Sequence, residues 1–331
     1  MRSVFILQGV LLPNDHPAVR GVIDSPAMTK PVETAVGGAS RLRIWWLAIR
    51  PATLTISLAP VLVGTSLAWH DAGRILWIPF ILAAAAALLI QIGTNLYNDV
   101  GDYERGADRT ERLGPPRAVS SGWLEAGEVR RAVVLVFSLA LAVGAWLVWH
   151  GGWPILLLGL ASIVAGIAYT GGPRPIAYGA TGELFVFVFF GIVAVMGTYY
   201  LQTFAWTWAG VIVASMIGAL AAAVIVVNNY RDLDYDRLAG KRTFAVRAGR
   251  AWSRVEFVAL LGAPYALLLG LGRSTHAGWW LALPFCSAPM ALWIAVRLVR
   301  ERPGSVFNRI LTDTAQLQLI FSCLLAVALL L

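Results

Sequence analysis

Two clusters of asparagine and aspartate residues could do chemistry, because each follows a long apolar run. The first has the spacing i, i+3, i+4 and i+7 and comprises Asn95, Asn98, Asp99 and Asp102. The second has the spacing i, i+4 and i+8 and comprises Asn228, Asp232 and Asp236. Residues three or four apart share a helix face, so each cluster is expected to present its oxygen atoms on one side.

Oxygen ligands without cysteine or histidine suit Mg²⁺ or Ca²⁺. Mg²⁺ typically takes one or two carboxylates and the phosphates of a substrate, so two such clusters predict a metal–diphosphate site. Basic residues beside the clusters are candidates to hold the remaining diphosphate oxygens: Arg105, Arg117, Lys241 and Arg242. The alternative for one cluster alone is a solvated helix end paired with nearby arginines. Two matched clusters favour the cation site.

The elements that position these clusters are expected to be membrane helices. The chain has 331 residues, of which 58% are hydrophobic and only 13% are charged, whereas soluble domains carry about a quarter charged residues. A membrane-spanning helix needs about 20 apolar residues. Nine segments qualify and predict an all-α, polytopic membrane protein: 46–69, 75–97, 131–150, 153–169, 183–201, 208–229, 255–272, 278–297 and 312–331.

The basic residues predict the orientation of these spans. With the N-terminus in the cytoplasm, only Arg74 and Arg273 of the 26 Lys and Arg residues fall outside, which is a strong positive-inside pattern. Both acidic clusters then lie on the cytoplasmic side, in an integral protein of the cell inner membrane. The net charge of +8 follows from this topology and needs no nucleic-acid partner. Nothing in the sequence indicates a protein partner.

The chain divides into two expected regions. Residues 1–43 mix proline, glycine and scattered charge, and we expect a mostly disordered cytoplasmic extension there. Residues 44–331 form the expected membrane domain. Within it, Asn98-x-x-x-Asp102 matches Asn228-x-x-x-Asp232, a faint repeat of the kind that can place two halves around a central cavity. The sequence lacks a G-x-x-x-x-G-K-[ST] motif, which excludes a P-loop nucleotide site.

Several strings resemble the UbiA superfamily of intramembrane prenyltransferases, from about residue 44 onward. "NDVGDYERGAD" (98–108) and "DLDYD" (232–236) resemble its two aspartate-rich motifs. Other strings resemble, more narrowly, the branch that prenylates 1,4-dihydroxy-2-naphthoate: "GPPRAVSSGWL" (114–124), "YTGGPRPIAYGATGELFVFVFFG" (169–191) and "GKRTFAVRAG" (240–249). The resemblance implies nine helices around a central cavity. It also implies Mg²⁺-dependent transfer from a polyprenyl diphosphate, with loss of CO₂ and diphosphate, in menaquinone or phylloquinone synthesis.

Residue roles follow from the matched motifs. The resemblance implies metal ligands at Asp99, Asp102, Asp108, Asp232 and Asp236. It implies diphosphate contacts at Asn98 and Asn228, beside the four basic residues named above. Arg50, Tyr169 and Glu183 are the candidates for catalysis at the aromatic acceptor, through an anion contact, a cavity hydroxyl and the only carboxyl that enters the fifth span.

Two alternatives stay open. Another aromatic acceptor, such as 4-hydroxybenzoate, homogentisate or a tetrapyrrole, would use the same diphosphate chemistry. A cation-coupled transporter would use the aspartates to bind its coupling ion. Transporters place such ions near the bilayer midplane, at broken helices, whereas these clusters lie at helix ends, which counts against transport.

Overall fold

The chain forms two compact units, Met1–Arg43 and Ile44–Leu331. The computed structural model describes residues 4–7, 10–13, 40–106, 113–275 and 278–331. In the first unit, strands β1 (Val4–Leu7) and β2 (Val10–Pro13) pair antiparallel. Most of the extension that we expect to be disordered lies outside the described residues, so that expectation stays a prediction.

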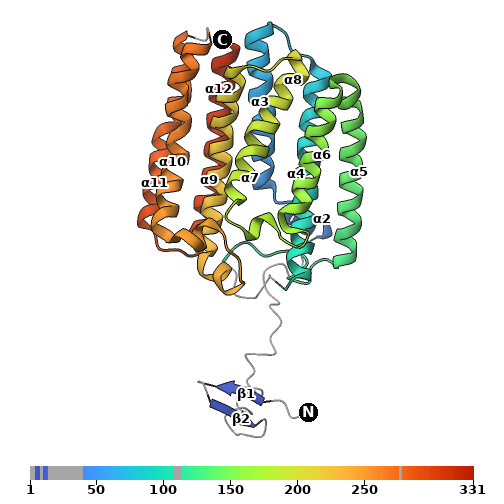
Figure 1. Ribbon diagram of the computed structural model, residues 1–331, viewed down its shortest axis with the longest axis vertical. Helices are drawn as coiled ribbons and strands as arrows, with labels where there is room; N and C mark the ends of the chain where they lie inside the picture. Colours follow the sequence, from blue (N-terminus) through green and yellow to red (C-terminus); the bar gives the residue numbers. More distant parts are fainter. Residues whose placement is uncertain (1–3, 8–9, 14–39, 107–112, 276–277) are drawn as a thin grey trace. The chain divides into compact units, whose positions relative to one another are not determined.

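The second unit is all-helical (Figure 1). Its elements are α2 (Arg41–Ala48), which begins just before the unit, α3 (Pro51–Ala72), α4 (Trp77–Glu104), α5 (Ala126–Gly151), α6 (Trp153–Thr170), η2 (Ile176–Tyr178), α7 (Gly182–Val186), η3 (Phe187–Val193), α8 (Ala194–Thr203), α9 (Trp208–Leu238), α10 (Phe244–Ser274), η4 (Gly278–Ser287), α11 (Ala288–Arg300) and α12 (Val306–Leu330). Within the described chain, nine helical stretches are long and apolar enough to cross a membrane, which confirms the predicted number. Two of them are composite: α7–η3–α8 and η4–α11.

The two helices that carry the clusters extend well beyond their apolar segments. Helix α4 continues to Glu104 and α9 to Leu238, whereas hydropathy alone ended these spans at residues 97 and 229. The clusters therefore lie on regular helix rather than in loops, and the helical spacing rule applies to them. We call the end of the bundle where α4 and α9 finish the motif end.

The first span is broken at Arg50, as the following proline predicts. Arg50 has φ 54° and ψ 70°, in the left-handed region, and it separates α2 from α3. Pro51 takes the first position of α3, where its missing N–H costs nothing. A residue before proline is disfavoured in the right-handed helical region, so the chain turns there. The turn leaves Arg50 against the bundle interior instead of continuing a straight helix.

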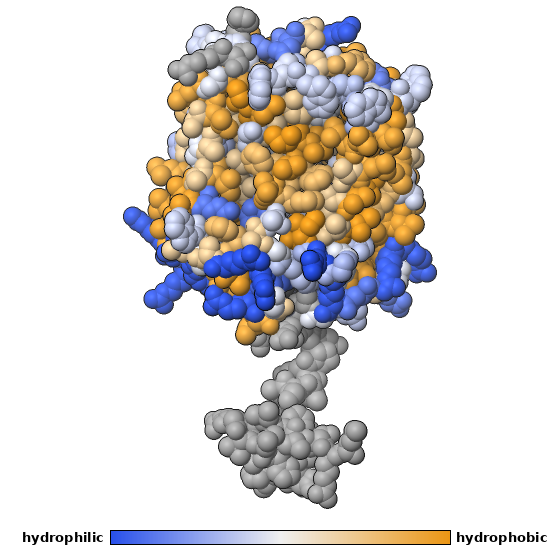
Figure 2. Space-filling model, in the orientation of Figure 1, coloured by the Kyte–Doolittle hydropathy of each residue, from blue (hydrophilic) through white to orange (hydrophobic). Residues whose placement is uncertain are grey.

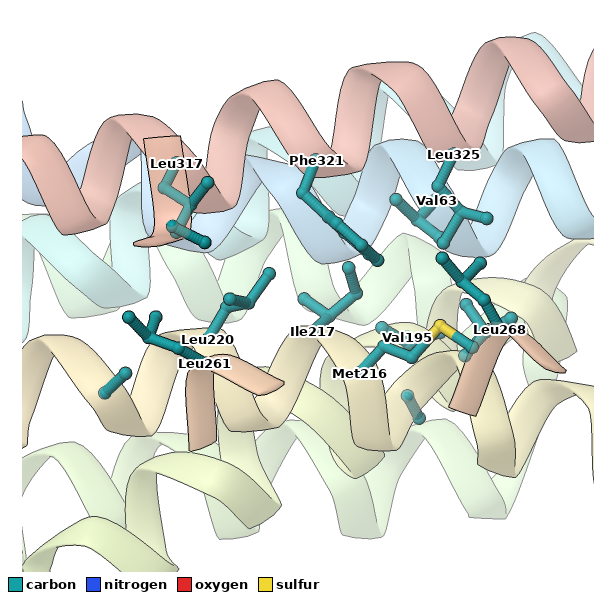
Figure 3. Close-up of a cluster of buried hydrophobic side chains, with 14 of the residues drawn as sticks. Val63, Val195, Met216, Ile217, Leu220, Leu261, Leu268, Leu317, Phe321 and Leu325 are labelled. Atoms are coloured by element: carbon teal, nitrogen blue, oxygen red, sulfur yellow. The ribbon is translucent and has the colours of Figure 1, made fainter. Parts of the chain in front are cut away.

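Helix α9 is the centre of the bundle. In its most apolar window 78% of residues are buried, against 17% for α6. Figure 3 shows side chains from α3, α8, α9, α10 and α12 meeting in the main apolar cluster, including Ile217, Leu261 and Phe321. Gly191 of η3 packs against Gly218 of α9 so closely that a Cβ on either glycine would clash with backbone. The helix of the second cluster is thus held by protein on all sides.

The surface matches a membrane protein. In Figure 2 hydrophobic residues form a band around the middle of the bundle, and hydrophilic residues gather along its lower edge. Large side chains such as Trp149, Trp153 and Leu157 are exposed on α5 and α6. Exposed apolar surface of this extent is typical of a lipid-facing wall.

Candidate active site

A cavity of about 720 Å³ opens at the motif end and extends deep into the bundle. At the motif end it is lined by both clusters and by basic side chains: Asn98, Asp102, Asn228, Asp232, Asp236, Arg50, Arg117 and Lys241. Its deeper wall is apolar and includes Leu147 and Ile155, which flank the α5–α6 turn at the opposite end. One cavity therefore joins a charged mouth to a long apolar chamber.

The first cluster points into the cavity through Asn98 and Asp102. Asn98 Oδ1 accepts a hydrogen bond of 2.7 Å from Thr170 Oγ1. Asp102 Oδ1 accepts one of 2.9 Å from the Tyr178 hydroxyl, and its other oxygen pairs with Arg117. The partners come from the end of α6, from η2 and from the loop after α4, so every bond crosses between elements.

Asp99 lies at the edge of the same helix face and faces a loop. Its carboxylate accepts hydrogen bonds from the backbone N–H groups of Ala118 (3.0 Å) and Val119 (3.4 Å). It is not among the described residues that line the cavity. These two hydrogen bonds hold the Asp99 carboxylate against the loop, whereas Asn98, about 100° away around the helix, faces the cavity. Asp99 instead anchors the loop that carries Arg117.

The second cluster faces the first across the cavity. Asp232 receives both of its hydrogen bonds from the preceding residue, with Arg231 Nε at 2.7 Å from Oδ1 and Nη2 at 2.6 Å from Oδ2. Asp236 pairs with Lys241, whose Nζ lies 3.1 Å from Oδ1. Asp234, on the opposite face of α9, has a 75% exposed side chain and pairs with Arg250.

Tyr178 connects the two clusters. Its hydroxyl bonds Asp102, its ring lies 4.9 Å from Lys241 Nζ, and its carbonyl accepts a bond from the Arg242 backbone N–H. Burial, together with the charge and hydrogen bond of Asp102, raises the pKa of Tyr178 above its ordinary value. The neutral phenol therefore remains a hydrogen-bond donor at neutral pH. Only its position in the Gly/Pro-rich loop drew attention to this region in the sequence.

The remaining predicted residues divide between the cavity and its surroundings. Arg50 and Tyr169 line the cavity. Glu183 is buried behind it, where Oε1 accepts a 2.7 Å bond from Asn229, a lining residue. Arg105 bonds the Gly172 carbonyl at the surface, outside the cavity lining. Arg242, whose backbone bonds Tyr178, does not appear in that lining either. Asp108 lies outside the described residues.

The donor set fits magnesium with substrate phosphates better than a closed protein cage. Over the described ranges, no three His, Cys, Asp or Glu side chains gather closely enough to hold a metal alone. Mg²⁺ usually keeps several waters and takes only one or two carboxylates, with phosphate oxygens completing its shell. The three carboxylates and three carboxamides of the two clusters that line this cavity provide such partial sites: Asn95, Asn98, Asp102, Asn228, Asp232 and Asp236.

A family model for the UbiA prenyltransferase family matches residues 57–329. The chain belongs to this family. Its curated relatives include two proteins named 1,4-dihydroxy-2-naphthoate octaprenyltransferase. The one from Escherichia coli (strain K12) is 36% identical, covering 84% of this chain and 92% of its own. The one from Mycobacterium tuberculosis (strain H37Rv) is also 36% identical, covering 86% and 96%.

UbiA-family structures share the fold. A UbiA homolog from Archaeoglobus fulgidus bound to GPP and Mg²⁺ superposes with a TM-score of 0.63 at 16% identity, covering 87% of this chain and 99% of the homolog. The apo homolog from Aeropyrum pernix K1 gives 0.63 over 84% and 97%, again at 16% identity. The predicted superfamily, prenyltransferase class and all-α membrane fold are thereby confirmed.

Proposed function

We propose that this UbiA-family chain transfers a polyprenyl group from a polyprenyl diphosphate to 1,4-dihydroxy-2-naphthoate, with loss of CO₂ and diphosphate, in menaquinone or phylloquinone synthesis. The observation that carries the chemistry is the single cavity with a charged mouth and an apolar chamber. The acceptor assignment is supported by relatives at 30–37% identity that bear this acceptor in their names.

The donor is proposed to bind along the whole cavity. Its isoprenoid tail would occupy the apolar chamber, and its diphosphate would lie between the two clusters. Asp102, Asp232 and Asp236, with Asn98 and Asn228, would hold Mg²⁺. The solved UbiA homologs bound to Mg²⁺ with DMAPP or GPP support the choice of ion and of a prenyl diphosphate. When bound, the ion neutralises the diphosphate as the allylic C–O bond breaks. Asp108 remains a further proposed ligand on sequence grounds alone.

Arg117 and Lys241 are the proposed diphosphate cations. Both line the cavity, and each already pairs with a carboxylate of one cluster. They therefore lie where the charge of a departing diphosphate develops, and fixed donors at such a position stabilise the transition state. Arg105 and Arg242, which lie outside the cavity lining, are assigned no diphosphate contact.

The acceptor is proposed to bind beside Arg50 and Tyr169. Arg50 would pair with the carboxylate of the naphthoate. The Tyr169 hydroxyl, next to Gly182, and the Asn229–Glu183 pair would orient a ring hydroxyl. The ring carbon that bears the carboxylate attacks the allylic carbon. A C–C bond forms there, CO₂ then leaves, and its bonding electrons restore the aromatic ring.

The membrane contributes the exclusion of water. An allylic cation reacts with any water present, so the reaction needs a dry chamber, which the apolar wall provides. We also propose that the motif end faces the cytoplasm with the N-terminus inside, in the inner membrane, because the basic residues concentrate on that side.

A reconstituted assay tests the proposal. The detergent-purified protein receives Mg²⁺, a polyprenyl diphosphate and one acceptor at a time: 1,4-dihydroxy-2-naphthoate, 4-hydroxybenzoate or homogentisate. We expect a prenylated, decarboxylated product only from the naphthoate, and none with EDTA. Product from another acceptor alone would overturn the acceptor and retain the prenyl transfer. Diphosphate release that needs no Mg²⁺ would overturn the metal assignment.

A further inference from the structure

Arg231 is a buried arginine without a place in the proposed chemistry. Its side chain is only 1% exposed, although it belongs to a helix end rich in surface arginines. It precedes Asp232 directly, yet it is not among the described residues that line the cavity. The sequence groups it with the arginines that determine topology. A buried guanidinium is costly unless its donors are satisfied, so its partners show what it is for.

Four hydrogen bonds engage four of the five N–H groups of the guanidinium. Nε and Nη2 bond the two oxygens of Asp232 at 2.7 and 2.6 Å. Nη2 also bonds Asn228 Oδ1 at 2.8 Å, and Nη1 bonds Asn308 Oδ1 at 2.8 Å. Two of the three partners, Asp232 and Asn228, line the cavity.

We call these four hydrogen bonds the Arg231 clamp. Asn308 connects the clamp to a second helix. It lies in the first turn of α12, a helix that packs against both α3 and α9. Its Nδ2 donates a 3.0 Å bond to the Leu113 carbonyl, in the segment that follows the first cluster. The guanidinium is therefore oriented from a second helix, and its direction does not depend on α9 alone.

We propose that Arg231 is a positioning residue that holds Asp232 and Asn228 in their cavity-facing orientations, with Asn308 as its second anchor, before any metal or diphosphate binds. This inference rests on the proposed function, since it concerns the same metal ligands. The clamp takes one direction of each Asp232 oxygen and leaves the remaining lone pairs for the cavity. Its charge also offsets one carboxylate in a site that must gather several.

A lysine at position 231 could not form the same set of hydrogen bonds. An arginine fork spans both oxygens of a carboxylate and still reaches two further acceptors, whereas a lysine ammonium is a point charge. Arg231→Lys keeps the charge and loses the clamp. By contrast, Arg231→Gln would leave a buried carboxylate unpaired and risks unfolding. The lysine variant is therefore the informative one.

The test measures Mn²⁺ binding directly. Mn²⁺ is titrated, without substrate, into detergent-purified wild-type and variant proteins, and the free ion is followed by electron paramagnetic resonance. Ordering one freed side chain costs roughly two- to tenfold in affinity, so freeing Asp232 and Asn228 predicts a dissociation constant raised by about tenfold or more in Arg231→Lys. Asn308→Ala, which keeps the Asp232 pair and removes the anchor, should weaken binding by about threefold.

The kinetic pattern distinguishes positioning from a general structural role. In Arg231→Lys the half-saturating Mg²⁺ concentration should rise with the Mn²⁺ constant, and turnover should recover largely at high Mg²⁺. A folding defect would lower the amount of active protein and leave both constants unchanged. Arg250→Lys is the matched control, because Arg250 pairs with the exposed Asp234 of the same helix. Its Mn²⁺ constant should equal that of the wild type.

Each outcome is decisive. An unchanged or tighter Mn²⁺ constant in Arg231→Lys would overturn the positioning role and leave the proposed function intact. An equal loss in Arg250→Lys would also overturn it, by showing a general effect of replacing any arginine that pairs with a carboxylate of α9. If the wild-type protein binds no Mn²⁺, either alone or with an unreactive diphosphate analogue that supplies the phosphate oxygens, the metal assignment in the proposed function fails together with this inference.

Discussion

The two aspartate-rich helix ends share a spacing and differ in how their carboxylates are held. Asp102 of α4 depends on Arg117 and Tyr178, which come from two separate loops. Asp232 of α9 is held by the residue directly before it, and Asp236 by Lys241 just after the helix. The first half of the site therefore forms only when distant segments close over it, whereas the second half is largely prepared by α9 and its immediate continuation.

The largest expected effect comes from removing a cavity-facing carboxylate. We expect Asp102→Asn and Asp236→Asn each to lower turnover by about a thousandfold or more, because the charge of the leaving diphosphate is then no longer balanced. Turnover at saturating Mg²⁺ measures this. Asp234→Asn is the matched control and should retain wild-type turnover, since its ion pair is exposed. Equal losses at Asp234 and Asp236 would refute the assignment by helix face.

The same two variants should differ in stability. Asp102→Asn leaves the buried Arg117 guanidinium, 9% exposed, without its carboxylate, whereas Lys241 is 16% exposed and keeps the Tyr178 ring. Stranding a buried charge costs roughly 3–5 kcal/mol. Thermal unfolding in detergent should therefore show a lower midpoint for Asp102→Asn than for Asp236→Asn. A lower midpoint for Asp236→Asn would mean that the second cluster, and not the first, depends more on contacts with distant segments.

An intermediate effect is expected at Asp99, which sharpens the comparison within one cluster. Asp99→Asn replaces a charged acceptor of two backbone N–H groups, worth about 1.5–3 kcal/mol. The loop at 117–119 should loosen, and turnover should fall by roughly ten- to thirtyfold as Arg117 loses its position. Limited proteolysis of that loop, read beside turnover, checks the cause. A loss equal to that of Asp102→Asn with an unchanged cleavage rate would restore Asp99 as a metal ligand.

The smallest effect is expected at Tyr178. Tyr178→Phe removes the hydroxyl bond to Asp102 and keeps the ring beside Lys241, so turnover should fall by about fivefold, near 1 kcal/mol. Burial and Asp102 raise the pKa of Tyr178, which extends its protonated, donating form to higher pH. The ratio of wild-type to variant turnover should therefore stay constant from about pH 7 to about pH 9. A ratio that falls toward unity across this range would show that the phenol ionises there.

Much of the fold was predictable because it follows from apolar length. Nine spans and the break before Pro51 both match the sequence pattern. The helix ends were less predictable, because hydropathy reports where the apolar segment stops and not where hydrogen bonding stops. Helix α4 therefore runs past residue 97 and α9 past residue 229. The π-helical segment η3 and the 3₁₀ start of the eighth span leave no clear trace in composition.

Helical spacing predicts which residues of the two clusters line the cavity. It does not predict which residues bind them. Asn98, Asp102, Asp232 and Asp236 line one cavity, as positions three to four apart predict. Asp99 does not line the cavity, because its carboxylate is hydrogen-bonded to the backbone of Ala118 and Val119 in a loop that the helical spacing does not reveal. The hydrogen bonds between Arg231 and Asp232 could not be predicted from the sequence, since neighbouring residues on a helix do not usually face one another. Its bond to Asn308 joins positions 77 residues apart, which no local pattern reveals.

The arrangement of α9 and α12 also orders the site in time. Chains enter the membrane from their N-terminal end as they are synthesised, and α12 follows every other described helix. Until α12 arrives, α9 lacks one of its walls and Arg231 lacks Asn308. The first cluster can meet its loop partners earlier, since Arg117 and Tyr178 precede α9 in the chain. The cluster that looks most self-contained in the finished protein is thus completed after the first cluster, when α12 inserts.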